Sequence, residues 1–264
     1  MDGRTNVPTL PVLEPGPSDI GIVGFPKSGH TWMQALIANL AYNVDPARVP
    51  DTVIQQLVPD VHWREPKRHS TPMFFKSHHL PRPEYRRVLY MLRDGRDVMV
   101  SYFHYLAALE ETPPDFLAMA RDGVPSWGHW HEHVEAWLAN PFGADLLVLR
   151  YERLQTAPLE ELARICEFTG LERDDRTLAR VVQSCSFEKL KSKEARQGLA
   201  NPAWPRDKSF FRRGQIGSHR DEMPSEIVTA FLQNARPTML KCGYVLEETP
   251  VGDLPAASLA FQSV

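Results

Sequence analysis

Cysteine is scarce in this sequence of 264 residues, which limits its disulfide and metal chemistry. The three cysteines, Cys166, Cys185 and Cys242, are an odd number and lack metal-ligand spacing. Their simplest interpretation is reduced thiols in a cytosolic protein. We therefore predict a cytoplasmic location and no bound metal.

Long hydrophobic runs and a strong charge of one sign are also missing. The first twenty residues hold prolines where a signal peptide needs an apolar stretch, and no later run approaches the length of a membrane span. The formal net charge of −3 argues against a nucleic-acid protein that works through bulk positive charge. We expect a soluble protein without membrane or nucleic-acid partners, in which any anion site is local.

The composition, 42% hydrophobic and 24% charged, is typical of one large globular domain. Residues 1–18 carry four prolines and residues 247–264 are similarly loose, so we interpret both as tails around a single domain of residues 19–246. Within it, residues 192–211 combine prolines, a glycine, charges and aromatics, which fits a long mobile loop able to close over a ligand.

Short apolar runs alternate with longer amphipathic stretches along the predicted domain. The runs read as buried strands and are "IGIVGF" (20–25), "MFFKSH" (73–78), "RVLYML" (87–92) and "LLVLRY" (146–151). Strands that alternate with helices indicate a parallel sheet covered by helices. The predicted fold class is therefore α/β.

The stretch "GFPKSGHTW", residues 24–32, joins the first predicted strand to a helical pattern, "TWMQALIANLAYN". Residues 26–30 would form the turn, and the N-terminus of a helix beside Lys27 suits an anion. The order of a nucleoside-triphosphate loop, G-x-x-x-x-G-K-[ST], is missing, and this loop is too short to wrap a triphosphate in that way. The alternative is a plain turn with a solvated lysine.

Three motifs in matching order resemble the cytosolic sulfotransferase family over about residues 19–224. "FPKSGHTW" is similar to the family's "YPKSGTTW", "LRDGRDVMVSYFHY" to its R-[NDE]-P-x-D-x-x-x-S-x-x-H segment, and "FFRRGQIGSHRDEM" to its F-x-R-K-G-x-x-G-D-W segment. Departures are Gly95 for the usual proline and "GSHR" for "GDWK". The resemblance implies a P-loop-like three-layer α/β fold with a central parallel sheet flanked by helices. It also implies sulfuryl transfer, without a metal, from 3′-phosphoadenosine 5′-phosphosulfate (PAPS) to a hydroxyl or amine of a small-molecule acceptor, releasing adenosine 3′,5′-bisphosphate (PAP).

The resemblance also implies a set of site residues by matching position. The donor site would comprise Lys27, Ser28, Gly29, His30, Thr31 and Trp32 around the phosphosulfate and adenine; Arg93, Ser101, Arg212, Arg213 and Gly214 at the 3′-phosphate; Tyr151, Cys185 and Phe187 at adenine; and Phe210. Lys27, Lys76, Ser101 and a histidine would be catalytic. Arg96 matches no family role and is interpreted as a surface ion-pair partner, an alternative that also stays open for Arg93.

"FFKSHHLP" offers two neighbouring histidines where the family shows one. Side chains alternate faces along a strand, so His78 shares the face of Lys76 while His79 takes the face of Ser77. We predict that His78 is the general base. His79 remains the alternative, as does the interpretation of both as surface residues near a turn.

The implied mechanism is in-line transfer, in which His78 takes the acceptor's proton and Lys27 and Lys76 stabilise charge on the leaving phosphate.

Two other functions compete with this interpretation. A nucleoside-phosphate kinase would require the Gly-Lys-Ser/Thr order and a metal-binding acid, and neither is evident. The second competitor is a non-catalytic nucleotide-binding module. Five aromatic residues near the expected entrance favour an apolar or aromatic acceptor; they are Phe103, Tyr105, Phe116, Trp127 and Trp130. The alternative is that several of them belong to the core. The tetrapeptide 217–220 and the loop 192–211 would help to shape that pocket. The oligomeric state stays open.

Overall fold

The computed structural model describes residues 15–62, 68–110, 112–201 and 203–246, and both predicted tails lie almost wholly outside these ranges. The strands are β1 (Ile20–Val23), β2 (Phe74–Ser77), β3 (Arg87–Leu92) and β4 (Asp145–Arg150). The helices are α1 (His30–Tyr42), α2 (Asp51–Leu57), α3 (Gly95–Leu109), α4 (Phe116–Asp122), α5 (Trp130–Ala139), α6 (Tyr151–Thr156), α7 (Pro158–Thr169), α8 (Asp175–Ser184), α9 (Phe187–Gln197), α10 (His219–Glu222) and α11 (Ser225–Lys241).

The four strands form one parallel sheet in the order β2-β1-β3-β4. Each strand falls within one residue of a predicted apolar run or inside it, which confirms the α/β class and the parallel sheet. Apolar residues fill both faces of the central strands because helices cover both. The fold is therefore the three-layer arrangement that the sequence predicted.

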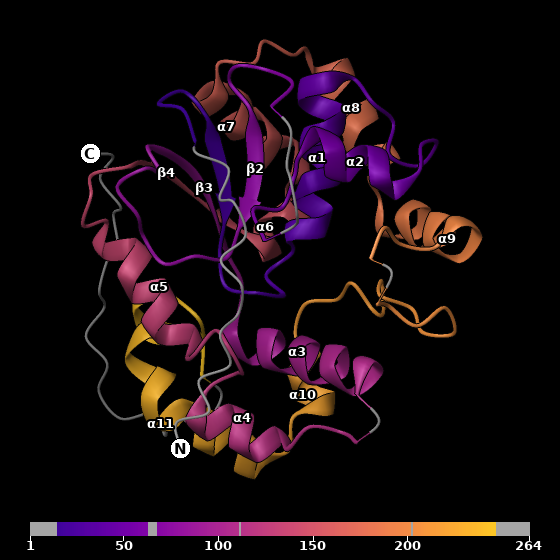
Figure 1. Cartoon of the computed structure of the whole chain (residues 1–264). Helices are drawn as coiled ribbons and strands as arrows, with labels where there is room; N and C mark the ends of the chain where they lie inside the picture. The colour runs from indigo at the N-terminus through magenta and orange to yellow at the C-terminus, as the bar shows by residue number, and fades with distance from the viewer. Residues whose placement is uncertain (1–14, 63–67, 111, 202, 247–264) are drawn as a thin grey trace, which may run out of the picture.

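Alternate residues of each strand enter two separate cores. Val88 and Tyr90 of β3 pack with α3, α4, α5 and α11 on one face of the sheet, whereas Leu89 and Met91 pack with α1, α7 and α8 on the other. In Figure 1 the first group of helices lies in the lower half of the view, and the second lies in the upper half beside the strands. The period-two alternation of strand side chains thus assigns each apolar residue to its core.

The segment that follows α8 differs from the prediction of one long loop over residues 192–211. Helix α9 continues to Gln197, so the first six of these residues are helical. Ser186 caps α9 by accepting a hydrogen bond from the Lys189 N–H at 3.4 Å, and Leu190 buries one face of the helix. A loop was predicted here because charged residues dominate the sequence of α9 and its apolar face is short. The irregular segment runs instead from Gly198 to Ser218.

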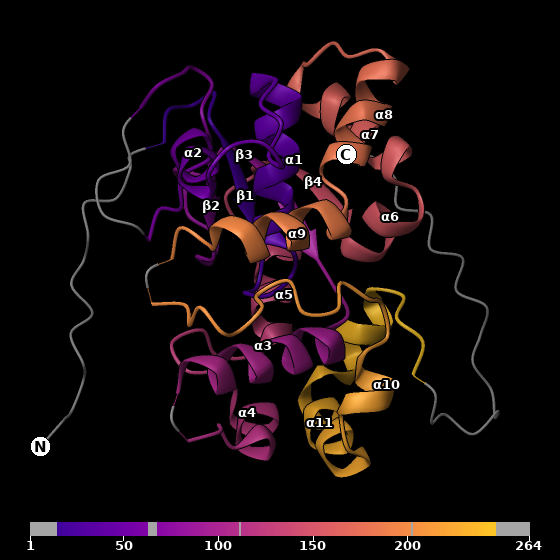
Figure 2. The same cartoon turned by 90° about the vertical axis from the view of Figure 1, so that its right-hand side faces the viewer.

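Helix α9 and the segment 198–218 cross in front of the strand ends, between α1 above and α3 below (Figure 2). Loops at the carboxyl ends of parallel strands commonly build ligand sites. Within the described ranges, no helix has the length and apolar character needed to cross a membrane. The cytoplasmic location stays a prediction.

Candidate active site

The turn between β1 and α1 presents backbone N–H groups at the carboxyl edge of the sheet. It spans residues 24–29, and α1 begins at His30 without a side-chain N-cap, so its first turn suits an anion. Gly29 has a φ of 106°, and a Cβ there would lie 2.8 Å from the Tyr151 ring. Both its conformation and its neighbour therefore require glycine. The predicted strand–turn–helix is confirmed.

Lys27 occupies this turn in a strained conformation. Its φ of 70° lies in the left-handed region, which costs a non-glycine residue about 1–3 kcal/mol and recurs at functional sites. The ammonium lies 4.3 Å from the centre of the Tyr105 ring and 4.1 Å from that of Phe210. Burial lowers the pKa of Lys27 to about 7, helped by the positive charges of Lys76, Arg93 and Arg212.

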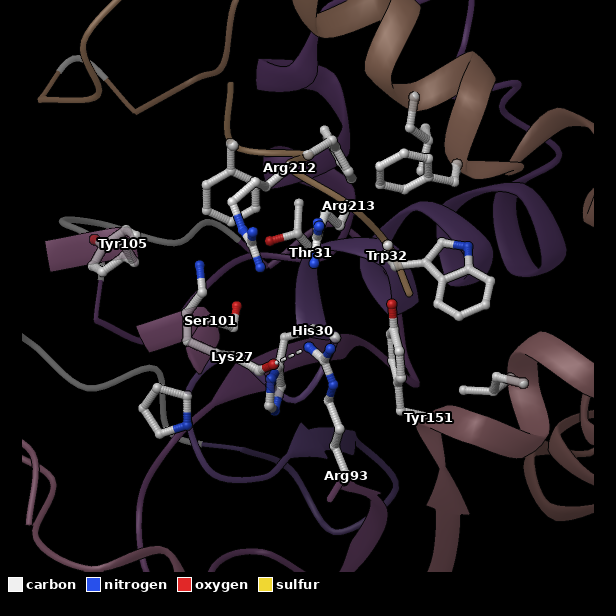
Figure 3. Close-up of a pocket in the computed structure, with 18 of the residues that line it drawn as sticks. Lys27, His30, Thr31, Trp32, Arg93, Ser101, Tyr105, Tyr151, Arg212 and Arg213 are labelled. Carbon is white, nitrogen blue, oxygen red and sulfur yellow. Dashed lines mark hydrogen bonds between the residues drawn. The ribbon is translucent and has the colours of Figure 1, made fainter. Parts of the chain in front are cut away.

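Arg93 follows β3 and is held from several sides. Its guanidinium donates to the Lys27 carbonyl at 3.1 Å and to the Gln215 carbonyl at 3.3 Å, and it stacks 4.2 Å from the centre of the Tyr151 ring (Figure 3). Asp97 lies 3.9 Å away. The Arg93 Nε is buried and has no hydrogen-bond partner within the described part of the chain. A rigid guanidinium with a spare donor suits an anionic ligand.

Arg96 corrects one prediction. It is 5% exposed, and it forms a two-point ion pair with Asp94, at 3.1 Å and 2.8 Å, instead of a surface pair. Asp94 also caps α3 by accepting from the Arg96 N–H at 2.9 Å, as its place at the helix start predicts. Gly95 departs from the family's proline because a Cβ there would meet the rings of Phe231 and Trp130 at 2.6 and 2.8 Å.

Arg212 and Arg213 both reach the carboxylate of Glu222 in α10. Arg212 donates to it twice, at 2.6 and 3.0 Å, and Arg213 once at 2.7 Å. Gly214 follows with a φ of 62°, and a Cβ there would lie 2.2 Å from the Phe187 ring. Gly214 therefore packs closely against the start of α9, while the side chains of both arginines pair with α10.

One cavity of about 640 Å³ gathers almost all the predicted site residues. Its walls include Lys27, Gly29, His30, Thr31, Trp32, Lys76, His78, Arg93, Ser101, Tyr151, Phe187, Phe210, Arg212, Arg213 and Gly214. In Figure 3 the side chains of Lys27, Arg93 and Arg212 converge from three separate segments. The cavity therefore holds a dense cluster of positive charge.

Two predicted residues do not line this cavity. The Cys185 thiol is buried and points toward the Ala35 carbonyl at 3.5 Å, while its own carbonyl accepts from the Trp32 indole N–H at 2.9 Å. Cys185 thus positions Trp32 instead of presenting its thiol to a ligand. Ser28 is fully buried, and its hydroxyl has no partner among the described residues.

His78 lines the cavity on the same side as Lys76, as strand alternation predicts. Its Nδ1 lies 2.9 Å from the Gly24 carbonyl, which only accepts, so Nδ1 carries the proton and Nε2 is the unprotonated nitrogen. Burial, followed by the charge of Lys76, holds the pKa of His78 well below 6.5. His78 is therefore a neutral imidazole with one basic nitrogen.

His79 is not among the residues that line the cavity. Its Nδ1 pairs with the Tyr85 hydroxyl at 2.9 Å, and its backbone N–H donates to the Ser77 hydroxyl at 3.1 Å. Burial, followed by the charge of Arg82, lowers the pKa of His79 to about 4. Its contacts are those of a structural residue.

Three of the five aromatic residues predicted near the acceptor have other roles. Trp130 is 2% exposed in the core, and Phe103 stacks on the buried Phe116 at 4.5 Å between ring centres. Tyr105 and Trp127 do line the cavity. Helical spacing does not distinguish a core face from a cavity face, which explains the difference.

Several residues around the site carried no sequence signal that we recognised. Asp60 and His62 line the cavity from a short segment beside β2. Asp97 was expected only at the start of a helix. Its carboxylate accepts hydrogen bonds from the backbone N–H groups of Gly217 at 2.7 Å and His219 at 3.0 Å, and it thereby holds the tetrapeptide 217–220 in place. These residues come together through contacts distant in sequence, which no local pattern reveals.

This chain is similar to known sulfotransferases over most of its length. The family model described as "Sulfotransferase domain" matches residues 17–243. Sulfotransferase 1C2 of Rattus norvegicus is 28% identical over 229 residues, covering 78% of this chain and 77% of the relative. Sulfotransferase 1B1 of Mus musculus is 28% identical over 230 residues, covering 78% and 77%. The chain belongs to the sulfotransferase family.

Solved structures show the same fold. A retinol dehydratase in complex with androsterone and inactive cofactor PAP superimposes with a TM-score of 0.69 at 19% identity, covering 84% of this chain and 81% of that one. A mouse sulfotransferase complexed with PAP has a TM-score of 0.66 at 22% identity, covering 87% and 88%. Family membership makes this chain a PAPS-dependent sulfotransferase, an enzyme that transfers the sulfuryl group of PAPS to an acceptor.

Proposed function

We propose that the enzyme sulfates a hydroxyl or amine of a small, apolar or aromatic acceptor, with His78 as the general base. The observation that carries the proposal is the hydrogen bond from His78 Nδ1 to the Gly24 carbonyl. It leaves Nε2 as a proton acceptor on a side chain that lines the cavity. The unprotonated Nε2 is available to accept a proton at neutral pH, whereas burial and the charge of Lys76 disfavour the imidazolium that results.

The residues around the cavity fit a PAPS molecule. Arg93 Nε is a buried polar group without a partner in the described part of the chain, and the ammonium of Lys27 faces aromatic rings and other cations instead of a carboxylate. An anion would relieve both conditions. We assign the first turn of α1 and Lys27 to the 5′-phosphosulfate, and Arg93, Ser101, Arg212 and Arg213 to the 3′-phosphate.

When bound, PAPS supplies an electrophilic sulfur and a phosphate leaving group. His78 Nε2 takes the proton of the acceptor's hydroxyl as its oxygen forms the new bond to sulfur. Lys27 stabilises the charge that the leaving oxygen gains, and Lys76 assists from the neighbouring strand. The aromatic rings of Trp32 and Tyr151 would orient the adenine. No covalent enzyme intermediate is required.

The acceptor side of the cavity is partly aromatic. Tyr102, Tyr105 and Trp127 line it together with the imidazoles of His62 and His78. Rings of this kind favour a flat or apolar body with a polar reacting group. Androsterone and retinol, bound by the retinol dehydratase, are acceptor-sized molecules of that character. A kinase is disfavoured because the loop lacks the Gly-Lys-Ser/Thr order, and a binding module because the base and both lysines meet at one cavity.

The test compares His78→Ala with His79→Ala on an acceptor found by screening hydroxylated and amino compounds with PAPS and detecting sulfated products by mass. Loss of a general base costs about 100- to 10,000-fold, so His78→Ala should lose turnover by that factor and still bind PAP. His79→Ala should keep most of its rate because its ring lies outside the cavity.

PAP affinity measured by calorimetry on both variants is the control for folding. A dead His79→Ala with an active His78→Ala would transfer the base assignment to His79. Phosphoryl transfer from a nucleoside triphosphate without PAPS-dependent turnover would support the kinase.

A further inference from the structure

A short segment beside β2 brings a buried carboxylate into the cavity. Asp60 is 5% exposed and pairs directly opposite Lys76 in a parallel bridge. The Lys76 N–H donates to the Pro59 carbonyl at 2.8 Å, and the Val61 N–H donates to the Lys76 carbonyl at 3.0 Å. Because opposed residues of parallel strands project to one face, Asp60 shares the face of Lys76 and His78.

Both carboxylate oxygens of Asp60 are used. One accepts from the Lys76 ammonium at 2.8 Å, and the other accepts from the His62 backbone N–H at 2.9 Å. Burial alone would raise the pKa of Asp60, but the charges of Lys76 and His78 and these two hydrogen bonds outweigh it and lower the pKa to about 2. Asp60 is therefore ionised, and it fixes the end of the flexible Lys76 side chain.

The base needs such a negative charge. As His78 takes a proton it becomes an imidazolium, and burial and nearby cations oppose that charge. The titratable groups that face His78 are Lys76, Asp60 and His62, His30 at 4.4 Å between ring centres, and His133, whose Nε2 donates to the His78 carbonyl at 3.1 Å. Of these five groups, Asp60 is the negative one.

We propose that Asp60 is a positioning residue for sulfuryl transfer: it fixes the Lys76 ammonium at the cavity wall, and its charge stabilises the His78 imidazolium as the acceptor's proton is taken. The inference rests on the proposed function, because it requires His78 to be the base. In this role Asp60 itself forms and breaks no bond. It acts through its two neighbours, as an orienting carboxylate does in other acid–base sites.

Asp60→Asn in the full chain is the test, because asparagine keeps the shape and the acceptor for the His62 N–H but removes the charge. We expect kcat to fall about 10- to 100-fold, the range for losing the outer partner of a functional group. The dissociation constant of PAP should change less than about threefold. The acid limb of the kcat profile should move to lower pH, since loss of the negative charge lowers the pKa of His78.

The same change in the His78→Ala background separates positioning from folding. Asp60→Asn should cause a clearly smaller further loss there, because the part of its effect that passes through His78 is already gone and only the part that passes through Lys76 remains. An equal loss in both backgrounds, or a wild-type kcat for Asp60→Asn, would overturn the inference. If wild type shows no PAPS-dependent turnover or His78→Ala is fully active, the proposed function itself fails.

Asp60→Glu covers the case in which Asp60→Asn does not fold. It keeps the charge but displaces the ammonium of Lys76 by one methylene. The acid limb should then stay at its wild-type position while kcat falls. A wild-type kcat, or a shifted limb with unchanged kcat, would contradict the positioning role.

Discussion

Lys27 carries a charge that its surroundings oppose in the ligand-free protein. The rings of Tyr105 and Phe210 attract the ammonium through their faces but do not neutralise it. Burial and the cations nearby lower its pKa to about 7, so the ammonium loses its proton much more readily than that of an ordinary lysine. An anionic nucleotide favours the protonated form and should raise this pKa.

PAP binding should therefore weaken as the pH rises above about 7. Below that pH Lys27 is already charged, whereas above it binding must be accompanied by uptake of a proton. The affinity should fall by up to about tenfold per pH unit until the pKa of the bound state is reached. Calorimetry at several pH values in two buffers of different ionisation enthalpy measures both the affinity and the proton uptake.

Lys27→Met is the control for this linkage. It should bind PAP more weakly than wild type at pH 7 and show a much flatter dependence on pH. A wild-type affinity that is constant between pH 7 and 9 would contradict the linkage. An unchanged slope in Lys27→Met would show that another group carries it.

At the scale of elements, α9 positions the segment that closes the cavity. Glu194 in α9 is 8% exposed, and its carboxylate accepts from the backbone N–H groups of Phe210 and of Phe211, the latter at 3.0 Å, and from the Ser209 hydroxyl at 3.2 Å. This anchor places Phe210 over Lys27. Farther along the segment, Trp204 stacks on Tyr105 at 5.6 Å between ring centres.

Glu194→Ala should release this segment without disturbing the sheet. Two backbone N–H groups lose their charged acceptor, and a hydrogen bond to a charged group contributes about 1.5–3 kcal/mol. Part of that loss is recovered by water, so we expect PAP affinity to fall about tenfold, or about 1.4 kcal/mol. Limited proteolysis should also cut faster between residues 198 and 218.

Arg196→Ala is the matched control, because Arg196 is exposed on the same helix. It should leave both measurements unchanged. If Glu194→Ala bound PAP with wild-type affinity, the position of Phe210 and the two arginines would not depend on this carboxylate.

At the scale of the whole molecule, the cavity that we propose as the nucleotide site lies where the upper and lower halves of the structure in Figure 1 meet. The turn before α1 comes from the upper half, Ser101 of α3 from the lower half, and the segment 198–218 spans them (Figures 1 and 2). A ligand that touches all three should stabilise the folded chain as a unit. Ligand present at 100 times its dissociation constant adds about 2.7 kcal/mol.

PAP should raise Tm by about 5–10 °C at that concentration, as expected for a domain of this size. Adenosine 5′-phosphate at the same concentration should raise it far less, because it lacks the 3′-phosphate assigned to Arg93 and its neighbours. Arg93→Gln should bring the two shifts close together. Differential scanning calorimetry of each protein with and without ligand makes the comparison.

Arg121→Ala is the control, because it removes an arginine from an exposed ion pair with Asp122. Arg96 would not serve, because its ion pair with Asp94 is buried. It should keep the wild-type difference between the nucleotides. Equal shifts from PAP and adenosine 5′-phosphate in wild type would contradict the assignment of the 3′-phosphate site.

The sequence by itself determined the strands, the turn before α1 and most of the charged residues of the cavity. Strands such as β3 are buried on both faces, so a short apolar run identifies them, and the turn depends on a few adjacent residues. Although β2 ends at Ser77, the alternation expected to continue past it predicts the observed difference: His78 lines the cavity and His79 does not. These features depend on interactions within a few residues.

Only the tertiary structure decided which side chains face the cavity and which are buried elsewhere. Trp130 and Trp127 look alike in sequence, yet α11 covers the first while the second faces the cavity. The burial of Arg96, the turning away of the Cys185 thiol and the pairing of Asp60 with Lys76 also depend on elements far apart in the chain. Burial and charge pairing follow from what packs against a residue, and neighbours distant in sequence supply that packing.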